Sequence, residues 1–238
     1  MAPGTLELLA RIALGEVRSE DYVSWACRSL EEGQDSRHLR MLAGMTADAS
    51  LFEVEELFGR VARELGLSLP SPERAVLDLA VHIARAMLGG EYDLRQGVRE
   101  LARLCAASEY RYDVLMPFHD LDETLDEMDM DSGYLLHPDL RERPWPEVAR
   151  DEAGLLLRFV EAGLLDGFRH QVACSACPHI GSPRSRDLEG LWKNLRDRLR
   201  RRPRTVAWVC QRCGSDQVVS LDRIAGRRRL LDSRSSAP

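Results

Sequence analysis

Two short segments of the chain carry residue types that could bind a metal together: CSAC, with Cys174 and Cys177, and CQRC, with Cys210 and Cys213. A CxxC turn presents two sulfurs to one ion, and two such turns supply the four tetrahedral ligands that Zn²⁺ prefers. The matched pairs therefore predict a zinc ion held by all four cysteines. Because four thiolates fill the coordination shell, no position remains for a substrate water, and the expected role of the zinc is structural.

Two other interpretations of the paired cysteines are less well supported. A redox dithiol of the thioredoxin type needs a βαβ unit around the CxxC, and no such unit is indicated here. His170 and His179 lie close enough in sequence to replace one sulfur, but four cysteines leave no deficit for them to fill. The remaining cysteines, Cys27 and Cys105, fall on apolar faces of predicted helices and are expected to be small buried core residues.

The residues around the pairs indicate short strands, each running into a cysteine pair or following one: RHQVAC, RTVAWVC and SDQVVSLDRI. This arrangement resembles a zinc ribbon over about the last third of the chain. Gly214 follows the second pair, where the backbone often needs a positive φ, whereas Pro178 follows the first pair. Thirty-two residues separate Cys177 from Cys210, against roughly 15–20 in the compact pattern. The expected explanation is a helix inserted at about 185–202.

Charge is distributed unevenly along the sequence, although the whole chain carries only −6. Residues 1–168 hold 17 basic and 33 acidic side chains, a net −16, whereas residues 169–238 hold 16 and 6, a net +10. Arginine clusters suit phosphate geometry. The arginines expected to contact nucleic-acid phosphates are Arg198, Arg200, Arg201, Arg202 and Arg204. Trp192 and Trp208 either supply stacking surfaces for bases or fill the small core of the ribbon.

Residues 119–131, HDLDETLDEMDMD, hold seven carboxylates. They could bind a divalent cation, face a basic surface such as the chain's own arginine-rich segment, or form a solvated helix or loop, which is the default interpretation. An EF-hand is excluded, because its glycine would fall one position late and Pro138 would replace the final glutamate. His119 and Asp120 form an HD pair, which alone is weak support for a metal phosphohydrolase. No recognisable catalytic motif is present in the sequence.

The first 110 residues show helical periodicity punctuated by glycines, and a weak similarity between two helix–turn–helix segments suggests a repeat. The predicted fold is mainly α: a helical bundle or short helical repeat, followed by a small β zinc ribbon with a helical insertion. The expected divisions are a helical domain (1–112), an acidic connector (113–144), a helix (145–167), the ribbon (168–231) and a disordered tail (232–238). No membrane-spanning run or signal peptide is evident, so the expected location is cytoplasmic.

These features predict a non-catalytic zinc-binding protein whose basic ribbon contacts nucleic acid. The alternative is a protein-interaction module of the immunity or adaptor type, whose acidic helical body binds a basic partner while zinc only folds the tail. A third hypothesis is an enzyme that uses the carboxylates at 119–131 with a divalent metal.

Overall fold

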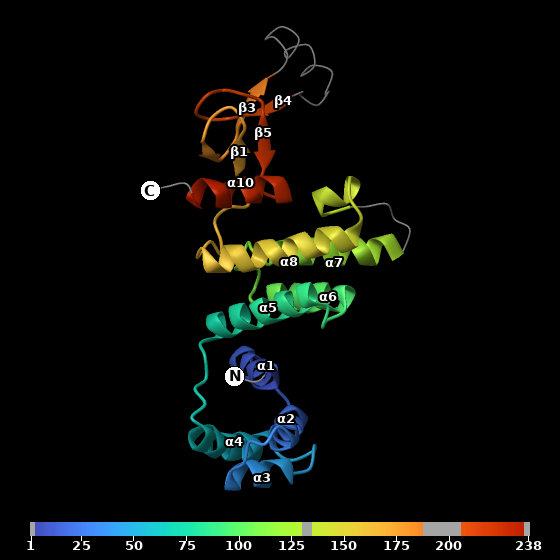
Figure 1. The fold of residues 1–238 in the computed structure, drawn as a ribbon, viewed down its shortest axis with the longest axis vertical. Helices are drawn as coiled ribbons and strands as arrows, with labels where there is room; N and C mark the ends of the chain where they lie inside the picture. Colours follow the sequence, from blue (N-terminus) through green and yellow to red (C-terminus); the bar gives the residue numbers. More distant parts are fainter. Residues whose placement is uncertain (1–2, 130–134, 188–205, 236–238) are drawn as a thin grey trace, which may run out of the picture. The chain divides into compact units, whose positions relative to one another are not determined.

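The structure, a computed structural model, describes residues 3–129, 135–187 and 206–235. Helices fill the first two thirds of the chain and short antiparallel strands lie near its C-terminus (Figure 1), which confirms the predicted mainly α class with a small β part. The helices are α1 (Pro3–Leu14), α2 (Ser19–Glu31), α3 (Arg37–Ala43), α4 (Leu51–Leu65), α5 (Pro72–Gly89), α6 (Leu94–Ala107), α7 (Met116–Asp129), the 3-10 turn η1 (Pro138–Arg141), α8 (Trp145–Glu161) and α10 (Ile224–Ser235). The strands are β1 (Val172–Cys174), β2 (Ile180–Gly181), β3 (Arg184–Asp187), β4 (Val206–Val209) and β5 (Val218–Ser220). None of the described helices is long and apolar enough to cross a bilayer.

The chain divides into two compact units, Met1–Ile83 and Ala84–Pro238, and the division falls within α5. The first unit has an aromatic centre, in which the ring of Phe58 lies 5.1 Å from Tyr22 and 5.4 Å from Trp25. Trp25 Nε1 donates to Thr5 Oγ1 at 3.0 Å, so its one polar atom is satisfied inside the core. Cys27, expected in this core, is exposed. The buried face of α2 is centred on Trp25 and leaves Cys27 at its edge.

In the second unit, α7 packs against α6 and α8. It contains most of the acidic run, and its Phe118, Leu121 and Leu125 are buried. As far as Asp129, the run is therefore one amphipathic helix rather than a loop. Asp126, on its exposed side, forms ion pairs with Arg95 and Arg99 of α6.

The C-terminal strands form two small antiparallel sheets. One has three strands in the order β2-β1-β5, and the other is the pair of β3 with β4, called the β3–β4 hairpin below. In the hairpin, Ser185 lies opposite Trp208 and Arg184 opposite Val209. Strand β3 occupies the first residues of the range 185–202 that was expected to be helical. It is a strand because its backbone pairs with β4. The rest of that range lies outside the described residues.

Helix α10 follows β5 and was not expected, because its residues up to 231 were assigned to the β ribbon. Its residues 232–235 also begin the tail that was predicted to be disordered. The helix lies so close to the end of β5 that a Cβ on Gly226 would sit 2.1 Å from the Ser220 carbonyl oxygen. Leu230 and Leu231 are buried, and α10 contacts β1, β5 and α8. It therefore joins the strands to the helices within this unit.

Candidate metal centre

The four predicted cysteines converge in the structure. The Sγ atoms of Cys174 and Cys213 are 3.6 Å apart, those of Cys177 and Cys210 are 3.7 Å apart, and all four lie within 4.8 Å of one another. Sulfurs at tetrahedral corners 2.3 Å from one ion would be about 3.8 Å apart. The sulfurs are much too far apart for disulfides, and all six cysteines are free. The cluster therefore has the size and ligand set of a site for one tetrahedral metal ion.

Strand pairing and a tight turn fix the two cysteine pairs. Cys174 is the last residue of β1, and its N–H donates to the His179 carbonyl at 3.0 Å. Cys210 directly follows β4, and the Gly214 N–H closes the turn by donating to the Cys210 carbonyl at 2.9 Å. Gly214 has φ +72, which confirms that this position needs a left-handed backbone. The two cysteines in each pair are thus held toward a common centre by the backbone.

Backbone N–H groups also point at the sulfurs. The Ala176 N–H donates to Cys174 Sγ at 3.3 Å. Burial raises the pKa of the Cys210 thiol, but hydrogen bonds from the backbone N–H groups of Cys213 and Arg212 outweigh burial and lower that pKa to about 7. Burial raises the pKa of the Cys177 thiol to about 12. Donors to sulfur favour thiolate, which is the metal-binding form.

Neither nearby histidine belongs to the sulfur cluster. His170 is exposed and has φ +65. His179 Nε2 lies about 3.2 Å from where a Cβ on Gly181 would be, so the ring covers that glycine. Among the described residues, the sulfur cluster consists of the four cysteines that the sequence pairs.

The β3–β4 hairpin exposes an aromatic residue among basic ones. Trp208 is 56% exposed, so it does not fill the ribbon core. Arg184, Arg186 and Arg212 are also exposed, and Arg186 Nη1 donates to the Gly214 carbonyl at 3.5 Å. None of these three arginines forms an ion pair with another described residue. The five arginines expected to contact phosphates, Arg198, Arg200, Arg201, Arg202 and Arg204, and also Trp192, lie outside the described residues.

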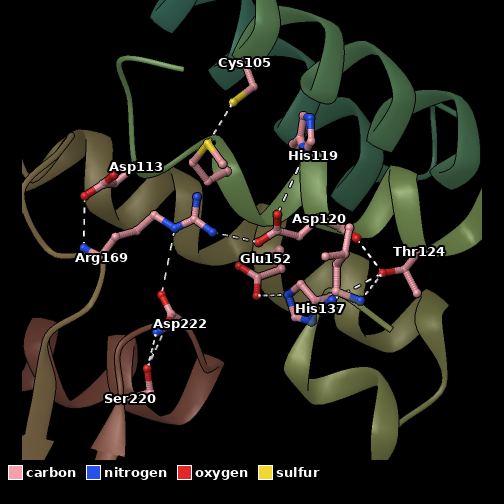
Figure 2. Close-up of polar contacts among 12 residues, drawn as sticks. Cys105, Asp113, His119, Asp120, Thr124, His137, Glu152, Arg169, Ser220 and Asp222 are labelled. Carbon is pink, nitrogen blue, oxygen red and sulfur yellow. Dashed lines mark hydrogen bonds and ion pairs between the residues drawn. The ribbon is translucent and has the colours of Figure 1, made fainter. Parts of the chain in front are cut away.

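Other arginines of the basic region pair with carboxylates that precede the ribbon within the second unit. Arg169 Nη2 lies 3.1 Å from Asp120 Oδ2, as Figure 2 shows, and Asp113 Oδ2 accepts the backbone N–H of Arg169 at 3.0 Å. Three corresponding pairs involve α10 and the residue that precedes it: Arg223–Glu142, Arg227–Glu152 and Arg228–Asp151. Within this unit, part of the −16/+10 asymmetry is therefore neutralised by internal ion pairs.

A second cluster of metal-ligand types, which the sequence did not indicate, lies in the same unit. His137, Asp139 and Glu152 are all buried, and one ligand atom from each lies within 4.8 Å of the others. His137 Nε2 is 3.0 Å from Glu152 Oε1, and Thr124 Oγ1 accepts the His137 backbone N–H at 3.3 Å (Figure 2). His137 precedes η1, Asp139 lies in η1 and Glu152 lies in α8. Their spacings match no motif, so only the tertiary fold reveals them.

Comparison with known proteins returned no relative: no protein-family model, no curated protein and no solved structure matches the chain. Its site chemistry must therefore be inferred from its own residues.

Proposed function

We propose that this protein is a non-catalytic cytoplasmic zinc-binding protein whose C-terminal ribbon contacts nucleic acid. The observation that carries the proposal is the exposed Trp208 of β4, which lies on a strand paired with β3, where Arg184 and Arg186 are exposed, and close in sequence to exposed Arg212 in the turn after β4. Arginine forks suit phosphate oxygens, and an exposed indole offers a stacking surface that any unpaired base can use.

Zinc has a structural role in this proposal. The ion links the turn after β1 to the turn after β4, and these turns belong to different sheets. With three-residue and four-residue strands, the ribbon has little apolar core of its own. Metal coordination therefore supplies folding free energy that burial does not. Four thiolates and one Zn²⁺ carry a net charge of 2−, and Arg186 and Arg212, next to the second cysteine pair, carry the opposite charge.

The test is fluorescence anisotropy of the zinc-loaded full chain with random single-stranded DNA, duplex DNA and RNA over a salt series. The full chain is needed because α10 packs on α8 and a ribbon fragment would lose that contact. We expect salt-sensitive binding that is strongest for single strands. Each arginine that contacts a phosphate should add about 0.7 to the salt slope on a single strand. Salt-independent or undetectable binding would contradict the proposal.

Two variants separate stacking from charge. Trp208→Ala should weaken single-strand binding about 5- to 150-fold, the equivalent of one stacked base worth about 1–3 kcal/mol. Phe52→Ala is the matched control, because Phe52 is 74% exposed but lies in the first unit. The double variant Arg184→Gln/Arg212→Gln should reduce the salt slope without removing the preference for single strands.

The exposed apolar surface of the first unit favours a second candidate function, binding of a basic protein partner by the acidic helical body. Phe52 (74% exposed) and Leu51 (40%) begin α4, and Met41 (49%) lies on α3, which packs against α4. Exposed large apolar side chains ringed by charge are typical of protein-binding surfaces. This function would be favoured if the chain binds no nucleic acid and if Phe52→Ala abolishes capture of a basic protein that the wild type retains.

A further inference from the structure

We propose that the second unit holds a second divalent metal ion, separate from the four cysteines and bound by His137, Asp139 and Glu152. The site lies where η1, α8 and α10 meet. This inference is independent of nucleic-acid binding, because it rests on different residues of the unit.

The ligand atoms have the required types and spacing. One ring nitrogen and two carboxylate oxygens lie within 4.8 Å of one another. His137 Nε2 and Glu152 Oε1 are 3.0 Å apart, and neighbouring ligands of an octahedral ion with bonds of about 2.1 Å are also separated by about 3.0 Å. The side chains of His137 and Glu152 are 1% and 2% exposed, and His137 Nδ1 is buried without a hydrogen-bond partner in the described part of the chain.

The group of charged side chains around these ligands carries more acidic than basic groups. A contiguous group of buried and half-buried side chains links them to the ion pairs of Figure 2. It contains five carboxylates against two guanidinium groups, a net charge of −3 when the histidines are neutral: Asp113, Asp120, Asp139, Glu152 and Asp222 against Arg169 and Arg227. Buried charge is costly unless it is compensated. A divalent ion would reduce the imbalance to −1.

The neighbouring ion pairs do not supply this missing charge. Arg143, which lies near Asp139, is bound to Asp151 at 2.7 Å and to Glu147 at 3.6 Å. Arg223 is bound to Glu142, at the exposed rim. Neither Arg143 nor Arg223 therefore offsets the negative charge of this group.

Outer hydrogen bonds already orient the two carboxylates and leave them able to bind a metal. Asp139 Oδ2 accepts the Ile224 N–H at 3.0 Å, so its other oxygen can face an ion. Arg227 donates to Glu152, and a carboxylate has about four lone-pair sites, enough for a guanidinium and a metal together. Such outer partners are typical of metal-binding carboxylates.

The donor set indicates the class of ion. Imidazole with two carboxylates suits a first-row dication such as Mn²⁺, Fe²⁺ or Zn²⁺, whereas thiolates select softer ions. Mn²⁺ is therefore the discriminating probe, because the four-cysteine site should retain zinc while the His137 site takes manganese.

The experiment is a Mn²⁺ titration of the full chain loaded with one zinc, in which free Mn²⁺ is followed by electron paramagnetic resonance. We expect one bound Mn²⁺ per chain. His137→Gln and Asp139→Asn should each weaken its binding by more than about 100-fold. Asp139→Asn is the key variant, because the asparagine oxygen can still accept the Ile224 N–H and preserve the fold. Circular dichroism and zinc content report folding of both variants.

Asp126→Asn is the matched control, because Asp126 is an exposed carboxylate in the acidic helix α7. It should leave Mn²⁺ binding unchanged. The proposal is overturned if the wild type binds no Mn²⁺, or if a folded Asp139→Asn variant binds Mn²⁺ as tightly as the wild type. Loss of binding in Asp126→Asn alone would assign the ion to the acidic face instead.

Discussion

Removing the guanidinium of Arg227 should destabilise the second unit far more than removing an exposed one. The side chains of Arg227 and Glu152 are 5% and 2% exposed, and Glu152 also bonds His137. Arg227→Met keeps much of the buried side-chain volume but leaves the Glu152 charge without its guanidinium partner. Deleting one partner of a buried ion pair typically costs about 3–5 kcal/mol. For a chain of this size, that cost corresponds to a fall in Tm of about 6–20 °C.

The assay is thermal unfolding of the zinc-loaded full chain, followed by circular dichroism. Arg158→Met is the matched control, because Arg158 pairs with Asp232 at 3.4 Å and both side chains are at least half exposed. Exposed pairs contribute at most about 1 kcal/mol, so the control should move Tm by only a few degrees. The double variant Arg227→Met/Glu152→Met should recover part of the loss, since it removes the Glu152 charge that Arg227→Met leaves without its guanidinium. Equal shifts for Arg227→Met and Arg158→Met would refute the reasoning.

Three further predictions concern the same unit. Gly226→Ala should destabilise it by about 1–3 kcal/mol, because a Cβ would sit 2.1 Å from the Ser220 carbonyl oxygen; a urea midpoint equal to that of the wild type would argue against this close contact. Burial raises the pKa of Asp120 in the folded protein, although Arg169 opposes the shift. The protonated Asp120 carboxyl therefore stabilises the fold fully at a pH below the ordinary aspartate pKa, and this stabilisation is lost as the pH rises through the raised pKa. The unfolding free energy of the wild type minus that of Asp120→Asn, measured in urea from pH 4 to 7, should therefore fall with pH, and a rise would show a lowered pKa instead. Chelation of zinc should remove hydrogen-exchange protection from β1, β4 and β5 while sparing α2 and α4; unchanged strand protection would mean that the metal does not hold the ribbon.

The sequence predicted the features that depend on local spacing. Two ligands three residues apart form one knuckle whatever surrounds them, so Cys174 and Cys177 could be assigned without a fold. Gly214 was recognisable for the same reason, because its turn needs a positive φ that favours glycine. Long amphipathic helices such as α4 and α8 were predictable because their apolar periodicity extends over several turns.

The features that the sequence did not predict depend on tertiary contacts. Cys27 directly follows Ala26, which lies on the buried face of α2. The apolar periodicity of a helix does not show where its buried face ends, so a small residue at the edge of that face cannot be assigned to the core from sequence. Helix α10 is held by Gly226 against β5 and by Arg227 against Glu152, and neither contact is visible in its arginine-rich sequence. The cluster of His137, Asp139 and Glu152 forms only when η1 packs on α8.

The four-cysteine centre is tested most directly by metal analysis of the purified full chain combined with X-ray absorption at the zinc edge. The expected result is one zinc per chain bound by four sulfurs at about 2.3 Å, and loss of that zinc in Cys210→Ser. A chain that retains no zinc, or a zinc shell that contains nitrogen in place of sulfur, would contradict the assignment of Cys174, Cys177, Cys210 and Cys213 as its ligands.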